Sequence, residues 1–227
     1  MATTLITGCD YGIGFEFASQ YAADGWRVHA ICLDPASEAL ITKLGADMQF
    51  HHVDVCDQSA VCALRDALAQ EPVDLLINNA ATFAPDGPGA LQLPEFEEFA
   101  RVMAVNAVAP IYVAETLIDN VAASEGRTMA FLSTRSGSIG DNSSGGHYAY
   151  RCSKTALNMA VKSMSIDFAA RGVMTVALHP GSVRTETRKG GQVDVGDSVA
   201  GMRSVLAGLT PEQSGSFARY DGGTIEW

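Results

Sequence analysis

The chain has 227 residues and a formal net charge of −11, with 47 % hydrophobic and 18 % charged residues. This composition supports a large buried core and excludes an intrinsically disordered chain. The acidic balance, without any basic run, also argues against a nucleic acid or an anionic membrane as partner.

The cysteines and the amino-terminal segment bear on the cellular compartment in which the protein is expected. Five cysteines, an odd number without any Cys-x-x-Cys pair, predict neither a disulfide framework nor a zinc site. The opening letters MATTLITGCD lack a basic region and a long apolar run, and no stretch reaches the roughly 18 unbroken apolar residues of a membrane span. We therefore expect a soluble, cytoplasmic protein.

Short apolar segments alternate with segments of helical spacing along the whole chain. The chain order predicts strand 3–8, helix 14–25, strand 27–33, helix 36–45, strand 48–55, helix 58–70, strand 73–80, helix 94–124 interrupted near Asn106 to Pro110, strand 127–134, helix 149–170, strand 173–181, helix 197–208 and strand 214–220. This alternation predicts an α/β fold: one Rossmann-type, doubly wound domain over residues 1–227, with a seven-stranded parallel sheet covered by helices on both faces.

A glycine-rich turn joins the first strand to the first helix. The letters TGCDYGIG place Gly8, Gly12 and Gly14 there, with the spacing GxxxGxG. Glycines at such a junction allow a tight turn and let helix N–H groups approach a pyrophosphate. A plain strand-to-helix turn is the alternative, but the position at the first βα junction favours a dinucleotide site.

The segment GGHYAYRCSKTAL, residues 145–157, combines two tyrosines with one lysine. A helix turns about 100° per residue, so Tyr150 and Lys154 lie roughly 40° apart, whereas Tyr148 and Lys154 point about 120° apart. Tyr150 is therefore the candidate partner of Lys154. Since such a pair also occurs by chance in helices, other segments must decide its role.

Four further motifs decide that role: NNAA at 78–81, MAVNAVAP at 103–110, YRCSK at 150–154 and HPGSVRTET at 179–187. Together with the glycine turn, they make the chain resemble the short-chain dehydrogenase/reductase family over nearly its whole length. The likeness is strongest to the branch of C-factor and sniffer-like carbonyl reductases. The resemblance implies an oxidoreductase that transfers a hydride between a nicotinamide coenzyme and a small alcohol or carbonyl substrate.

The resemblance assigns Tyr150 as general acid/base and Lys154 as its electrostatic partner. Hydride transfer at a carbinol carbon requires a proton to leave or join the oxygen. Tyrosine has a reference pKa of about 10, which a nearby lysine ammonium lowers by favouring the phenolate. Lys154 is also expected to donate to the nicotinamide ribose.

The resemblance implies two more catalytic residues, Thr134 and Asn106. In the run LSTRSG, Thr134 stands where the family usually has a serine that hydrogen-bonds the substrate oxygen, sixteen residues before Tyr150, which suggests a short insertion in loop 138–146. Ser133 and Ser138 remain alternatives, as does a purely structural hydroxyl at position 134. Asn106 matches an asparagine that holds a water in the proton path, with an ordinary helix-break amide as the alternative.

The glycine turn and the resemblance together imply a coenzyme site. Four parts of the chain are expected to form it: the glycine turn, the ends of the second to fourth strands, the acid/base pair and the segment that covers the nicotinamide. The residues are Gly8, Asp10, Gly12, Ile13, Gly14, Asp34, Asp54, Val55, Asn79, Ala80, Ala81, Tyr150, Lys154, Pro180, Gly181, Val183 and Thr185. Ala81 replaces the family's usual glycine.

Charge near the expected adenine ribose favours NAD, with NADP not excluded. Leu33 stands where related carbonyl reductases tend to have an arginine, and Asp10 and Asp34 would repel a 2′-phosphate. Asp34 either accepts from a ribose hydroxyl or is a turn residue before a proline. If NADP were preferred, Arg27 or Lys43 would have to reach the phosphate.

The remaining features concern metals, substrate size and assembly. The histidines form no metal-binding pattern, so no metal site is predicted. The polar loop 186–196, where the family places its substrate lid, is short, which argues against a bulky, deeply enclosed substrate. The apolar faces of helix 94–124 and segment 156–169 resemble the family's dimer-forming pair and imply a homodimer or homotetramer. A coenzyme-binding regulatory protein with little turnover is the alternative function.

Overall fold

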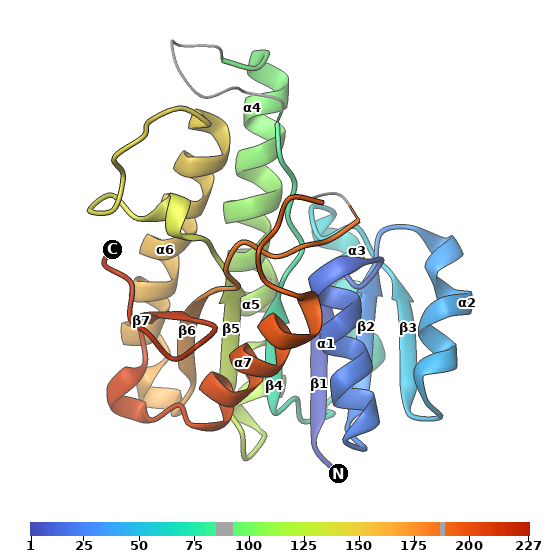
Figure 1. Ribbon diagram of the computed structural model, residues 1–227. Helices are drawn as coiled ribbons and strands as arrows, with labels where there is room; N and C mark the ends of the chain where they lie inside the picture. Colours follow the sequence, from blue (N-terminus) through green and yellow to red (C-terminus); the bar gives the residue numbers. More distant parts are fainter. Residues whose placement is uncertain (85–92, 187–188) are drawn as a thin grey trace.

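Seven parallel strands form one sheet in the order β3-β2-β1-β4-β5-β6-β7 in the computed structural model, which describes residues 1–84, 93–186 and 189–227 (Figure 1). The strands are β1 (Thr3–Thr7), β2 (Arg27–Cys32), β3 (Met48–His52), β4 (Leu75–Asn78), β5 (Thr128–Leu132), β6 (Met174–His179) and β7 (Ser216–Arg219). The predicted seven-stranded parallel sheet is thereby confirmed. The strand order reverses between β1 and β4, which opens a crevice at their carboxyl ends.

Helices cover both faces of the sheet (Figure 1). They are α1 (Gly12–Ala23), α2 (Glu38–Ile41), α3 (Gln58–Leu68), α4 (Phe96–Met103), α5 (Ala109–Ala122), α6 (Tyr148–Asp167) and α7 (Val195–Ala207). Phe17 of α1 and Met202 of α7 pack in one core layer, whereas Leu64 of α3, Leu117 of α5 and Leu157 of α6 pack in the other. Because both faces are covered, strands such as β5 are buried along their whole length.

One predicted helix, 36–45, is wrong as a single element. Residues Pro35–Ser37 form a 3₁₀ turn, α2 has only four residues, and Thr42–Leu44 form another 3₁₀ turn. Asp34 caps the first turn by accepting from the Ala36 N–H at 2.8 Å. Ile41 is the buried residue of α2, so little apolar burial rewards a longer regular helix.

The predicted interruption of helix 94–124 is a π-helical turn. Residues Ala104–Val108 form this turn between α4 and α5, and Pro110 lies in the first turn of α5. Proline has no N–H to continue the regular hydrogen-bond ladder, which permits the wider turn. Phe96–Ala122 has the length and apolar composition of a membrane span, but Val113 and Leu117 pack into the core beside the sheet.

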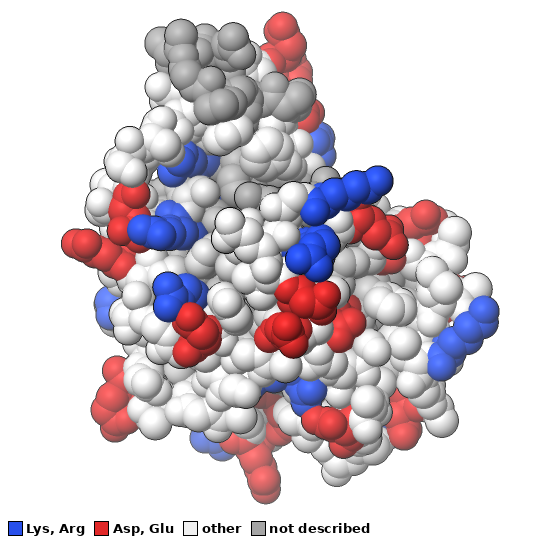
Figure 2. All heavy atoms as spheres, in the orientation of Figure 1, with Lys and Arg blue, Asp and Glu red and all other residues white. Residues whose placement is uncertain are grey.

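Charged side chains are mixed over the surface. On the described part of the face in Figure 2, Lys and Arg lie scattered among Asp and Glu. This distribution agrees with the net charge of −11 and offers no broad basic face in that view for a polyanion.

Candidate active site

The glycine turn adopts a conformation that a dinucleotide cradle needs. Gly8 and Gly12 have φ of +71° and +63°, in the left-handed region. A Cβ on Gly8 would lie 2.8 Å from the Ala80 Cα, and one on Gly14 would overlap the Gly8 carbonyl. The turn thus brings β1, α1 and β4 together so closely that only glycine fits. The start of α1 therefore presents backbone N–H groups that suit a pyrophosphate, with Ile13 beside them in the first helical turn.

Asn79 fastens the glycine turn to the end of β4. Its side-chain Nδ2 donates to the carbonyl oxygens of Thr7 and Gly8 at 3.0 and 2.9 Å. The Thr7 hydroxyl in turn accepts from the backbone N–H groups of Asn79 and Ala80, at 3.0 Å each. Thr7, which the sequence motifs do not single out, is thus part of this junction at the strand-order reversal, with Ala81 following it.

Asp10 organises the loop after β2. Its carboxylate accepts from the N–H groups of Leu33 and Asp34 at 3.1 and 2.9 Å and from the Ser37 hydroxyl at 3.0 Å. Asp34 caps the following 3₁₀ turn, which agrees with its interpretation as a turn residue. The expected adenine ribose region therefore has two carboxylates that are held in place by backbone.

The end of β3 supplies the other predicted adenine contacts. Asp54 accepts from the Cys56 N–H at 2.9 Å, and Val55 packs partly buried against the core. Both residues follow β3, at the carboxyl edge of the sheet where the glycine turn also lies. The structure therefore places them on the same edge as the expected coenzyme.

Tyr150 and Lys154 lie together in the first two turns of α6. The Lys154 Nζ is 6.0 Å from the centre of the Tyr150 ring and donates to the carbonyl of Leu132, the last residue of β5, at 2.8 Å. Lys154 is only 2 % exposed, and burial lowers the pKa of its ammonium to about 8. The Lys154 ammonium is thus buried beside the Tyr150 ring and bound to a neutral carbonyl.

Three candidate hydroxyls follow β5, and their contacts differ. Ser133 donates to the Asn158 side chain at 2.6 Å and is buried, and the buried Ser138 accepts from the Asp141 N–H at 3.1 Å. The Thr134 oxygen accepts from the Ser136 N–H at 3.2 Å, and Thr134 is only partly buried. Because Ser133 and Ser138 are both buried, Thr134 carries the most accessible hydroxyl of the three.

Asn106 joins two segments of the site from the π-helical turn. Its fully buried side chain accepts from the Thr82 N–H at 2.7 Å and donates to the Thr82 carbonyl at 2.8 Å. Its Nδ2 also donates to the Ser153 hydroxyl at 3.1 Å, and that hydroxyl donates to the Tyr150 carbonyl at 2.8 Å. One amide therefore connects the chain after β4 with the turn of α6 that carries Tyr150.

The segment after β6 returns over the glycine turn. Pro180 accepts from the Ser198 hydroxyl through its carbonyl at 2.6 Å, and Gly181 has φ of +85°. Val183 is buried and bridges to Val193, while the Thr185 methyl lies 3.7 Å from where a Gly12 Cβ would be. Of these four predicted residues, Thr185 thus lies against the glycine turn, whereas residues 187 and 188 of the predicted lid lie outside the described residues.

The chain resembles known proteins over the length that forms this site. The sequence model of the family described as short chain dehydrogenase matches residues 2–194. The C-signal protein of Myxococcus xanthus is 42 % identical over 159 residues, which cover 69 % of this chain and 93 % of that protein. A 1-hydroxy-2-glutathionyl-2-methyl-3-butene dehydrogenase of Rhodococcus sp. (strain AD45) is 32 % identical over 238 residues, covering 100 % of both chains.

Solved structures share the fold as a whole. The carbonyl reductase Sniffer of D. melanogaster superposes with a TM-score of 0.90 at 28 % identity, covering 100 % of both chains. The NADPH-bound carbonyl reductase from chicken fatty liver gives a TM-score of 0.88 at 27 % identity, covering 100 % of this chain and 99 % of the other. The predicted likeness to C-factor and sniffer-like proteins is therefore confirmed.

Proposed function

Since the chain belongs to the short-chain dehydrogenase family of oxidoreductases, which use nicotinamide coenzymes on small molecules, we propose that it interconverts an alcohol and a carbonyl compound with Tyr150 as general acid/base. The observation that carries this proposal is the buried Lys154 ammonium beside the Tyr150 ring. When bound, the nicotinamide supplies or accepts the hydride.

The protein's own residues manage the proton. In the reductive direction the Tyr150 O–H donates its proton to the carbonyl oxygen as the carbon receives the hydride, and in the oxidative direction the phenolate takes the proton back. The Lys154 charge stabilises the phenolate, because burial removes the water that would otherwise screen it. Thr134 donates a hydrogen bond to the same substrate oxygen, and Asn106 holds the two supporting segments at a fixed spacing.

The experiment that tests this function is a substrate panel. Aldehydes, ketones and secondary alcohols are assayed with the purified protein and either coenzyme, and absorbance is followed at 340 nm. Turnover that Tyr150→Phe abolishes supports the proposal. The C-signal likeness makes a regulatory protein the second candidate, and coenzyme binding without turnover on any substrate would favour that function.

We also propose a preference for NAD over NADP. Asp10, in the glycine turn, and Asp34, after β2, place two carboxylates beside each other, and Arg27 lies at the opposite end of β2, paired with Glu71 at 2.9 Å. The chicken carbonyl reductase binds NADPH, so the preference must be measured. We expect kcat/KM with NADH to exceed that with NADPH, and Leu33→Arg, at an exposed position, to raise the NADPH value. Equal or better use of NADPH by the native chain would contradict the charge argument.

We further propose that residues 1–227 act as one coenzyme-binding domain that assembles into a homodimer or homotetramer in the cytoplasm. Large apolar side chains are exposed at the junction of the π-helical turn with α5 and along α5 and α6. They are Val108, which directly precedes α5, Ile111 and Tyr112 of α5, and Met159 and Ile166 of α6. Met159 and Ile166, both on α6, are 69 % and 67 % exposed, which is unusual for large apolar side chains that lie on one helix. Sedimentation that shows only a 23.9 kDa particle at micromolar concentration would contradict the assembly.

A further inference from the structure

An aromatic ring lies against the candidate acid/base and remains open to solvent. The Phe83 ring centre is 4.8 Å from that of Tyr150, with an interplanar angle of 53°, and 5.5 Å from that of His147, with an angle of 55°. Phe83 is nevertheless 51 % exposed. One side of the Phe83 ring therefore contacts Tyr150 and His147, and the rest of the ring faces solvent.

We propose that Phe83 is a specificity-determining residue, whose exposed ring forms a wall of the substrate site and selects carbonyl compounds that carry a flat apolar substituent on the reacting carbon. This inference rests on the proposed function, since it places the substrate oxygen at Tyr150. A flat group on the carbonyl carbon then lies within reach of the neighbouring ring.

The backbone that carries Phe83 is held firmly. Asn106 makes two hydrogen bonds to the preceding residue, Thr82, one to its N–H and one to its carbonyl. The following residue, Ala84, is fully buried and packs with Val102 of α4 and Ala149 of α6. With both neighbours anchored, the Phe83 ring has a defined position relative to Tyr150, as a selective wall requires.

The second ring of this wall is held by an uncommon backbone conformation. His147 has φ of +49°, directly after Gly145 and Gly146 at +60° and +68°. A left-handed conformation is uncommon for a residue with a Cβ, and such residues cluster at functional sites. It turns the chain into α6 and leaves the His147 ring beside Phe83, so three aromatic rings border the place where the substrate oxygen is expected.

The chemistry of these rings favours a particular substituent. Aromatic groups prefer offset or tilted contacts with centres about 4.5–7 Å apart, and such contacts are worth more than the buried area alone. An aryl or conjugated group on the carbonyl carbon can cover the open side of Phe83 and remove apolar surface from water. A short alkyl chain covers less of the ring and makes no ring contact, so it gains less.

The test compares benzaldehyde with butanal in the native protein and in Phe83→Ala. We expect KM for benzaldehyde to rise about tenfold in the variant, since an aromatic contact of this kind is worth about that factor, with kcat within about twofold. KM for butanal should change by less than about twofold. Phe83→Tyr should retain the native preference. Phe96→Ala serves as the matched control, because Phe96 is also a phenylalanine and is 81 % exposed at the start of α4.

The outcomes separate this inference from the proposed function. If the native protein reduces either aldehyde but Phe83→Ala leaves the ratio of the two kcat/KM values unchanged, the specificity role is overturned and the oxidoreductase proposal stands. An equal loss of kcat on both aldehydes would also overturn it, because Phe83 would then only position Tyr150. If no carbonyl compound is turned over by the native protein, the proposed function fails and this inference fails with it.

Discussion

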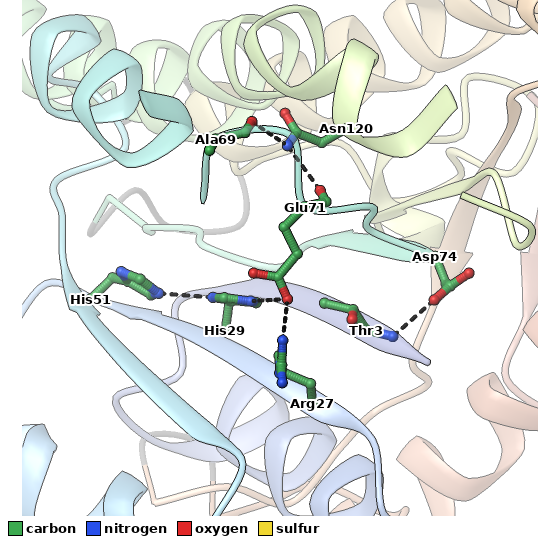
Figure 3. Close-up of polar contacts among 8 residues, drawn as sticks. All are labelled: Thr3, Arg27, His29, His51, Ala69, Glu71, Asp74 and Asn120. Carbon is green, nitrogen blue, oxygen red and sulfur yellow. Dashed lines mark hydrogen bonds and ion pairs between the residues drawn. The ribbon is translucent and has the colours of Figure 1, made fainter. Parts of the chain in front are cut away.

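Among the described residues, two basic side chains are buried, Lys154 and His29, and their partners differ in kind. Lys154 lies at the carboxyl end of β5 and is held by the neutral carbonyl of Leu132. Toward the amino end of β2, His29 lies between the imidazole of His51, 3.0 Å away, and the carboxylate of Glu71, 3.5 Å away (Figure 3). Among the described residues, the Lys154 ammonium has a neutral carbonyl as its acceptor, whereas His29 belongs to a chain of groups that ends in the Glu71–Arg27 ion pair.

The contacts of Glu71 show that the second cluster is structural. Its carboxylate pairs with Arg27 at 2.9 Å, and its backbone carbonyl accepts from the Asn120 side chain of α5 at 2.9 Å (Figure 3). Burial lowers the pKa of His29, with Glu71 opposing the shift, and burial together with His29 lowers the pKa of His51 to about 4. These histidines are therefore neutral near pH 7. The comparison teaches that a lowered pKa occurs in both regions and does not by itself identify a site, so the surroundings of each group must be compared.

The largest expected effect is in the region of Lys154. Tyr150→Phe removes the proton donor but keeps the ring that contacts Phe83, so we expect kcat to fall by about 100-fold or more while coenzyme affinity stays nearly unchanged. The measurements are steady-state kinetics and fluorescence titration with coenzyme. Tyr148→Phe, on the same helix, is the control and should change kcat little. Retention of more than roughly a tenth of kcat by Tyr150→Phe would remove Tyr150 from the mechanism.

The next largest effect is expected in the cluster of His29, His51 and Glu71, and it should change the stability of the fold but not the catalytic rate. Glu71→Ala removes the carboxylate that pairs with Arg27 at 2.9 Å and lies 3.5 Å from the buried His29 Nε2, so we expect the free energy of unfolding in urea to fall by about 2 kcal/mol, with kcat unchanged. Glu98→Ala is the matched control, because Glu98 pairs with Arg101 on the surface of α4 and its removal should lower the free energy of unfolding much less. A loss of kcat without a loss of stability would mean that this cluster serves the reaction.

The same two regions show how much the sequence could predict. Tyr150 and Lys154 are four residues apart in one helix, so a local spacing places them together, and the glycine turn is likewise local. His29, His51 and Glu71 come from β2, β3 and the loop after α3, and only the strand register and the packing of α3 bring them together. No spacing in the sequence could reveal that cluster.

Two other features that the sequence did not predict also depend on contacts between distant parts of the chain. The irregular segment that replaces helix 36–45 depends on Asp10, which lies more than twenty residues earlier and binds the loop backbone. The exposed ring of Phe83 becomes informative only once Asn106 fixes the preceding residue beside α6. The sequence pattern could predict the strand and helix order because apolar periodicity is local, whereas these contacts depend on tertiary structure.

The smallest expected effect is a pH dependence of stability that the second region contributes. The folded-state pKa of His51, about 4, and that of His29 both lie below the unfolded value of about 6.5, so the unfolded state binds more protons between these limits. Stability is therefore fully present above about pH 6.5 and is lost as the pH falls from there toward 4. Glu71, whose pKa is lowered, stays ionised over most of this window, and Arg27 stays charged throughout.

Urea unfolding at pH 7.5, 6.5 and 5.5 measures this contribution in the native protein and in His51→Gln. We expect the native free energy of unfolding to lose about 1 kcal/mol more than the variant between the first and last of these pH values, because the variant lacks one of the two titrating imidazoles. The pH profile of kcat should be the same in both proteins, since the proposed acid/base pair, Tyr150 and Lys154, lies on α6 and not in this cluster. Equal pH slopes of stability would show that His51 is not neutralised by folding, and an altered kcat profile would show that the two regions are coupled.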